Sequence, residues 1–133
     1  MKKVIYILLL FAFFQVSGQT TYYKEYFENG KLKAEGWLNK NQKVDYWFYY
    51  FENGNKKKEG HFKNNKKCKW WIFYNPNDEI NKKCEFKNDQ INGFSLFYRN
   101  NQIIRAEKYV MGKKIKEWNS LTEFKKDNNI NFL

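Results

Sequence analysis

Apolar and polar residues are distributed in two different ways along the chain. Residues 4–14 form an unbroken apolar run behind Lys2 and Lys3, and residues 15–18 are polar or small. Further along, apolar and polar residues alternate with a period of two, which is typical of half-buried β-strands, and polar turn segments recur about every 10–12 residues. This pattern predicts an all-β body and disfavours helix there.

The N-terminal apolar run has the order of a secretory signal peptide. A basic start, an apolar stretch and a small-residue end place the cleavage between Gly18 and Gln19. The alternative is an uncleaved anchor, but residues 4–14 fall short of the ~20 apolar residues that span a bilayer. We therefore predict that residues 1–18 are removed and that the mature protein is exported, to the periplasm or the cell exterior, with no membrane-spanning segment.

The body of the chain repeats with a period of 24 residues. Tyr26-Phe27-Glu28-Asn29-Gly30 recurs as Tyr50-Phe51-Glu52-Asn53-Gly54, and the period continues through Tyr74 and Tyr98. This divides the chain into a lead-in at 19–25, four ungapped copies at 26–49, 50–73, 74–97 and 98–121, and a C-terminal cap and tail at 122–133. Each copy predicts a β-hairpin, with Asn-Gly as a tight turn. A hairpin of this size cannot bury its own apolar face, so the copies are expected to stack into one elongated antiparallel meander.

Columns of the repeat predict which side chains share a face. One column holds Gly36, Gly60, Cys84 and Lys108, and an aromatic column holds Tyr46, Trp70, Phe94 and Trp118. Because consecutive side chains of a strand point to opposite faces, Trp47 and Trp71 are predicted on one face and Trp70 and Trp118 on the other. After the last copy, Ser120 and Glu123 have the spacing of a capping box, which predicts one short amphipathic helical turn over Leu121 and Phe124.

The repeat unit resembles a known family. The residues that carry the resemblance are Tyr26, Glu28, Asn29, Gly30 and Gly36 in copy one, Tyr50, Glu52, Asn53, Gly54, Gly60 and Phe62 in copy two, and Trp47 and Trp71. They resemble the MORN repeat, in the bacterial variant that is labelled a YwqK-type antitoxin. Where that family has glycine, Asn41, Asn65 and Asp89 stand here, and Asp45 and Lys69 replace a second glycine that only Gly93 keeps. Asn and Asp can still form a left-handed turn. The resemblance implies an interaction module, with neutralisation of a toxin by direct contact as the alternative.

Composition adds a basic and aromatic surface to this prediction. The chain has a formal net charge of +11 and 21% aromatic residues. Lysine clusters such as Lys56, Lys57 and Lys58 either keep sheet edges soluble or form a positive stripe for acidic proteins, acidic glycans or anionic lipid headgroups. The aromatic columns either form the core or leave one face exposed for binding, so the candidate binding rings are Trp47, Trp71, Trp70 and Trp118. Nucleic acid is a disfavoured partner outside the cytoplasm.

Catalytic and cofactor chemistry has little support in the sequence. His61 is the only histidine, and no catalytic motif, phosphate-binding loop or metal-spaced cluster occurs, so no cofactor is expected. Cys68 and Cys84 form a candidate disulfide that an oxidising compartment favours. The predicted hairpin disfavours this disulfide. Depending on the turn, Cys84 lies opposite either Lys69 or Trp71, and in neither case opposite Cys68. We therefore predict a non-enzymatic exported module that binds a protein partner or an anionic envelope component.

Overall fold

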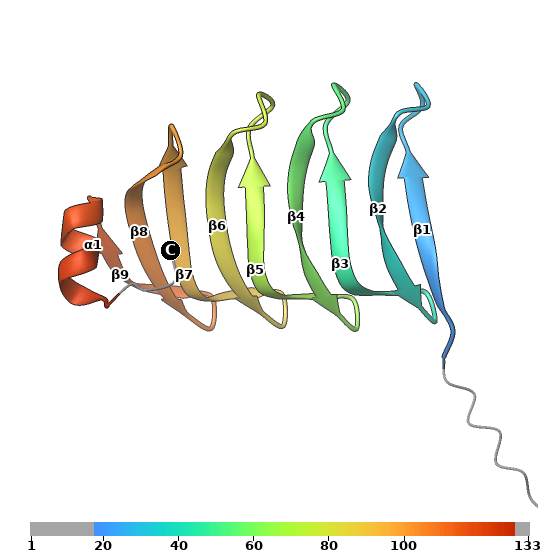
Figure 1. Ribbon diagram of the computed structural model, residues 1–133. Helices are drawn as coiled ribbons and strands as arrows, with labels where there is room; N and C mark the ends of the chain where they lie inside the picture. Colours follow the sequence, from blue (N-terminus) through green and yellow to red (C-terminus); the bar gives the residue numbers. More distant parts are fainter. Residues whose placement is uncertain (1–17, 130–133) are drawn as a thin grey trace, which may run out of the picture.

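The computed structural model describes residues 18–129, which form one sheet and one helix. Residues 1–17 of the predicted signal peptide and residues 130–133 of the predicted tail lie outside this part of the chain. The strands follow one another in chain order, each antiparallel to the next, so the sheet is an open nine-stranded meander (Figure 1). The elements are β1 Thr20–Tyr26, β2 Leu32–Asn39, β3 Gln42–Tyr50, β4 Lys56–Lys63, β5 Lys66–Tyr74, β6 Ile80–Lys87, β7 Gln90–Arg99, β8 Gln102–Val110, β9 Lys113–Trp118 and α1 Leu121–Asp127. The predicted all-β meander is confirmed.

The turns along the lower edge of the sheet in Figure 1 use asparagine and aspartate where left-handed backbone is required. Lys40 and Asn41, between β2 and β3, have φ values of 47° and 62°. The pairs Asn64–Asn65 and Asn88–Asp89 repeat this geometry in the next two hairpins. Two consecutive residues with positive φ are typical of the type I′ turn, whose twist matches that of the flanking strands. Asn and Asp thus take over the left-handed turn position, as predicted.

The Asn-Gly turns along the upper edge are longer than predicted. Tyr26 is paired with Leu32, so residues 27–31 connect β1 to β2. Within this connection Gly30 has a φ of +81°, and Asn29 Oδ1 accepts a hydrogen bond from the Lys31 amide at 3.0 Å. Asn29 itself is not among the residues with positive φ, so its side chain and not its backbone shapes the turn. The equivalent turn between β3 and β4 has the same form.

A bulge bends the second strand of each of the first three hairpins. Asp45 in β3 and Lys69 in β5 have φ values of 56° and 59°, and Gly93 in β7 has +125°. At the first bulge the pairing passes from Gly36↔Trp47 directly to Trp37↔Val44, which leaves Asp45 and Tyr46 of β3 without a partner in β2. Bulges bend a strand and increase its twist, and curved strands are visible in Figure 1. This bend helps a single-layer sheet to surround side chains on one of its faces.

β1 extends the repeat into the predicted lead-in. Tyr22, Tyr23 and Tyr26 lie one repeat period before Tyr46, Trp47 and Tyr50, and β1 pairs with β2 as β3 pairs with β4. β1 is thus the second strand of an additional, earlier repeat unit. It forms an edge of the sheet, and all of its residues except Glu25 are exposed.

The fourth copy is not ungapped. Tyr98 is paired with Ile103, whereas Tyr74 is paired with Ile80, so four residues separate the later pair and five the earlier one. The row of directly paired residues that contains Cys84 therefore continues through Ser95 to Glu107. The predicted membership of Lys108 in this column is wrong, because the shorter turn shifts β8 by one residue.

The two faces of the sheet bury different clusters. We call the face onto which Trp47 and Trp71 point the tryptophan face; its hydrophobic cluster consists of the buried residues Ala34, Trp47, Phe62 and Trp71. We call the opposite face the helix face, because α1 covers it near the C-terminal end; its hydrophobic cluster consists of the buried residues Leu96, Ala106, Trp118 and Phe124. The core is therefore divided between the N-terminal part of one face and the C-terminal part of the other.

α1 begins as the capping-box spacing predicts. Ser120 Oγ accepts a hydrogen bond from the Glu123 amide at 3.1 Å, and Glu123 Oε2 accepts one from the Asn119 amide at 2.9 Å. Phe124 is fully buried, and its ring centroid lies 5.1 Å from that of Trp118 and 5.3 Å from that of Phe94. The helix therefore closes the last hairpin by covering one of its faces.

Candidate binding surface on the tryptophan face

Three of the four predicted binding tryptophans lie in the core. Trp47 and Trp71 are 1% and 0% exposed, and Trp118 is 6% exposed beneath α1. Trp70 is partly buried and packs beside the second cluster on the helix face. The predicted division of the four rings between two faces is confirmed, but Trp47, Trp71 and Trp118 are enclosed by neighbouring rings and cannot be an exposed binding surface.

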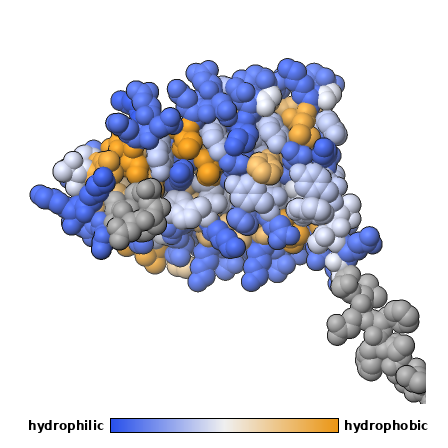
Figure 2. Space-filling view, viewed as in Figure 1, coloured by the Kyte–Doolittle hydropathy of each residue, from blue (hydrophilic) through white to orange (hydrophobic). Residues whose placement is uncertain are grey.

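Large exposed apolar side chains lie instead at the two ends of the sheet. Near the N-terminal end, Tyr22 and Trp37 pack edge to face with ring centroids 5.0 Å apart, and both are about 40% exposed. Near the C-terminal end, Ile104, Val110, Met111 and Ile115 are exposed. Figure 2 shows hydrophilic side chains between the apolar ones on the visible face, without one continuous apolar patch. The middle of the sheet is therefore distinguished by charge and not by apolar area.

A row of alternating rings and cations crosses the tryptophan face from β3 to β8. Each member is directly paired with the next, and we call the row the cation–aromatic ladder: Tyr49, Lys58, Phe73, Lys82, Phe97 and Arg105. Lys58 Nζ lies 4.7 Å from the centroid of the Tyr49 ring, and Lys82 Nζ lies 5.0 Å from that of Phe73. Arg105 Cζ lies 4.1 Å from the centroid of the Phe97 ring. These distances allow cation–π attraction, so the row is internally stabilised.

Two further lysines extend this positive surface toward the tight turns. Lys43 Nζ lies 4.7 Å from the Trp47 ring and donates a hydrogen bond to Tyr49 Oη at 2.8 Å. Lys67, one repeat period later, has its Nζ 4.9 Å from the Phe86 ring. The aliphatic parts of such side chains can cover core rings while the charge stays in water. Sequence reasoning pointed to Lys58 but missed Lys43 and Lys82, although lysines that recur at the repeat period (43 and 67, 58 and 82) were a readable signal.

The lysines of this surface have no carboxylate partner within residues 18–129. Salt bridges in this part of the chain involve none of Lys43, Lys58, Lys67 and Lys82. Arg105, in contrast, is paired with Glu107 at 3.5 Å. Burial lowers the pKa of Lys43, and burial followed by repulsion from Lys67, Lys57 and Lys43 lowers the pKa of Lys58. The folded protein therefore holds the charges of Lys43 and Lys58 at a cost that a bound anion would reduce.

The predicted lysine cluster of β4 does not form one patch. Lys56 Nζ lies 3.2 Å from both Glu59 Oε1 and Tyr74 Oη, on the helix face. Lys57 is exposed, and its Nζ lies 5.7 Å from the Phe51 ring. Lys58 joins the ladder on the tryptophan face. Alternation along the strand and the register shift beside Tyr50 separate the three side chains. The lysines that share a face are therefore those spaced by the repeat and not those adjacent in sequence.

The two cysteines are free. Cys84 is paired with Trp71, which is one of the two predicted registers, and its Sγ lies 2.9 Å from Ser95 Oγ. Cys68 is paired with His61 and points to the opposite face of the sheet. Burial raises the pKa of the Cys84 thiol. The candidate disulfide is therefore not formed, because the strand alternation directs the two sulfur atoms apart.

Neither comparison with known proteins nor the remaining described side chains identify a ligand for this surface. The chain matches no protein-family model and no curated protein. Within residues 18–129, no group of three or more His, Cys, Asp or Glu side chains is placed to hold a metal ion. The single helix described there is too short to cross a membrane. What the protein binds must therefore be inferred from its own surface.

Proposed function

We propose that the protein is an exported, non-enzymatic repeat module of the MORN type that binds an acidic protein segment or an anionic envelope surface through the cation–aromatic ladder. The observation that carries this proposal is the set of lysines on the tryptophan face that have no carboxylate partner among the described residues, Lys43, Lys58, Lys67 and Lys82. The order of residues 2–18 supports export, and cleavage before Gln19 would leave β1 intact because β1 begins at Thr20.

The spacing of the ladder suits an elongated anionic partner. Lys58 and Lys82 are two strands apart in one row, which is about 10 Å at ~4.8 Å per strand. A peptide in the extended polyproline II conformation has three residues per turn and rises about 3.1 Å per residue, so acidic residues at every third position lie on one side of it, about 9 Å apart. Phe73 lies between the two lysines and offers an apolar contact. Glutamates lie near both ends of the positive row, Glu25 on β1 and Glu107 on β8, so the attraction is confined to the middle of the sheet.

Charge of this kind acts mainly on the rate of association. Exposed cations increase the association rate of an anionic partner and make binding depend on salt, whereas buried aromatic contacts slow dissociation. We therefore expect the double substitution Lys58→Gln and Lys82→Gln to lower the association rate several-fold at low salt and to weaken the salt dependence.

The test uses two probes, a peptide with Glu at every third position and vesicles that contain phosphatidylglycerol. A matched control, Lys63→Gln with Lys87→Gln, removes the same charge from exposed turn-flanking positions. The proposal requires binding of at least one probe and a larger loss in the ladder variant than in the control. Equal losses would show that only net charge matters, and no binding of either probe at low salt would show that the lysines serve solubility alone.

A further inference from the structure

On the helix face, the repeat places a tyrosine hydroxyl against a glutamate in the first two hairpins. Tyr50 Oη donates a hydrogen bond to Glu35 Oε1 at 2.7 Å. Tyr74 Oη likewise donates to Glu59 Oε1, and Lys56 Nζ lies 3.2 Å from the same oxygen. Glu59 is only 6% exposed, so the second hairpin holds a buried carboxylate between a hydroxyl and an ammonium group.

In the third hairpin this carboxylate is replaced by a lysine. Tyr98 lies one repeat period after Tyr74, and Lys83 lies one repeat period after Glu59. Lys83 Nζ lies 5.2 Å from the Tyr98 ring. Burial alone raises the pKa of Tyr98, whereas burial and then the hydrogen bond to Glu59 raise that of Tyr74 to about 12. Within residues 18–129, the third hairpin therefore presents the Tyr98 hydroxyl and the Lys83 ammonium group without a carboxylate paired to either, because Lys83 stands where the earlier hairpins have glutamate.

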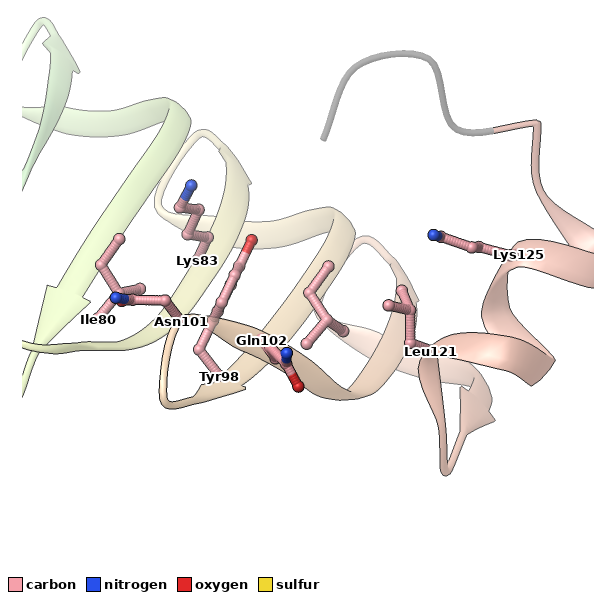
Figure 3. Close-up of a pocket in the computed structure, with 8 residues that line it drawn as sticks. Ile80, Lys83, Tyr98, Asn101, Gln102, Leu121 and Lys125 are labelled. Carbon is pink, nitrogen blue, oxygen red and sulfur yellow. The ribbon is translucent and has the colours of Figure 1, made fainter.

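These two donors line a pocket of about 640 Å³ between the third and fourth hairpins and α1 (Figure 3). Its apolar wall consists of Ile80, Ile103 and Leu121. In Figure 3 the Lys83 and Tyr98 side chains lie side by side, and the Lys125 side chain extends from α1 toward the same space. The volume lies within the range of small-molecule sites, roughly 300–1,000 Å³.

The replacement of Lys56 by Ile80 at the equivalent position of the repeat gives the pocket its mixed character. The second hairpin has lysine at this position, where it forms a salt bridge with Glu59, and the third hairpin has an apolar side chain that lines the pocket. One end of the pocket therefore presents Lys83 and Tyr98, and its wall presents aliphatic carbon. A ligand that satisfies both parts needs an anionic head and an apolar body.

We propose that this pocket binds a small carboxylic acid with an apolar body, whose carboxylate supplies the acceptor that Glu35 and Glu59 supply in the first two hairpins. Tyr98 Oη donates to the carboxylate, and the Lys83 ammonium supplies the opposite charge that Lys56 supplies to Glu59. Such charge-assisted hydrogen bonds are about twice as strong as neutral ones. The site lies on the helix face, away from the cation–aromatic ladder, so this proposal does not depend on the proposed function and can fail separately from it.

A titration followed by two-dimensional NMR tests the proposal. The probes are octanoate and 3-phenylpropionate, and 3-phenylpropionamide is the neutral counterpart of the second. We expect the two acids at millimolar concentration to shift the resonances of Ile103 and Leu121, and the amide to bind at least about tenfold more weakly because it lacks the charge.

The decisive variant is Lys83→Glu, which restores the glutamate of the earlier hairpins. The introduced carboxylate should accept the hydrogen bond of the Tyr98 hydroxyl and so weaken binding of both acids by at least about tenfold. Tyr98→Phe, which removes the hydroxyl, should weaken binding by a similar factor. The matched control Lys87→Glu makes the same charge change at an exposed position at the other end of β6, outside both proposed sites, and should bind the acids as the wild type does. Lys83→Gln is the second variant if Lys83→Glu does not give a dispersed spectrum. Binding of the amide as tightly as the acid, wild-type affinity in both Lys83 variants, or no shifts with either acid would overturn the proposal.

Discussion

Gly60→Ala is the substitution whose effect follows most directly from the packing of the tryptophan face. A Cβ atom at Gly60 would lie 2.4 Å from Trp71 Cδ2 and 2.5 Å from Cγ and Cε2. Ordinary contacts between carbon atoms are about 3.5–4.0 Å, so the ring must withdraw by about 1 Å or more. It has little room, because the Phe62 ring stands edge to face against it with centroids 4.9 Å apart.

The expected cost is about 3 kcal/mol. Overpacking a filled core costs about 1–3 kcal/mol. Displacement of the ring also breaks the hydrogen bond from Trp71 Nε1 to the His61 carbonyl oxygen, 3.1 Å long, which contributes about 1 kcal/mol. The control is Gly54→Ala, where a Cβ meets no atom within 4 Å and only the φ of +90° resists the change, at about 1 kcal/mol.

Urea unfolding followed by far-UV circular dichroism measures both costs, and the near-UV spectrum reports the packing of Trp71. Gly60→Ala should lose about 3 kcal/mol and change the near-UV spectrum, and Gly54→Ala should lose less and keep it. In the third hairpin a larger residue replaces the glycine and a smaller one replaces the tryptophan, because Cys84 and its partner Ser95 stand where Gly60 and Trp71 stand in the second. Equal losses from both variants, with an unchanged near-UV spectrum, would refute the view that glycine is present to admit the ring.

Three other predictions test separate parts of the molecule. Phe124→Ala should cost about 3–5 kcal/mol and speed amide exchange in β8 and β9 but not in β3 to β5, because Phe124 packs only at the C-terminal end; uniform exchange would contradict this. Burial, and then the positive charge of Lys69, lower the pKa of His61 below its ordinary value of 6.5. As the pH drops below 6.5, His61 therefore binds a proton more readily in the unfolded state than in the folded state. Stability should therefore fall as the pH drops below this value, and a wild-type slope in His61→Gln would contradict the assignment. The exported protein should have the intact mass of a chain that begins at Gln19, and retention of Met1 would reject the predicted cleavage.

The sequence predicted the fold well because the information that determines it is local and repeated. The period of two, the recurring hairpin unit and the spacing of Ser120 and Glu123 each predict one element, and the structure contains all of them. The lead-in escaped recognition because only tyrosines at matching positions relate β1 to β3. The shift in the fourth copy depends on a single residue in the turn before Gln102, which an ungapped comparison cannot show.

The binding surface was harder to predict because it depends on how the strands bend. Alternation assigned Trp47 and Trp70 to opposite faces, but the bulge at Asp45 and the neighbouring rings decide that Trp47 is the buried one. Lys56, Lys57 and Lys58 are adjacent in sequence, yet pairing to β3 sends Lys56 and Lys58 to different partners. The charge reversal from Glu59 to Lys83 was readable from the repeat columns, and only the pocket beside it required the structure.

NMR of lysines labelled by reductive ¹³C-methylation can locate the binding surface, because the label keeps the charge and gives a separate signal for each lysine. On addition of the acidic peptide, we expect the largest shifts at Lys43, Lys58, Lys67 and Lys82, and we expect a higher salt concentration to reverse them. Lys63 and Lys87, at the turns, should shift little. Shifts that are largest at the turn lysines, or spread evenly over all lysines, would contradict the assignment of the tryptophan face as the binding surface.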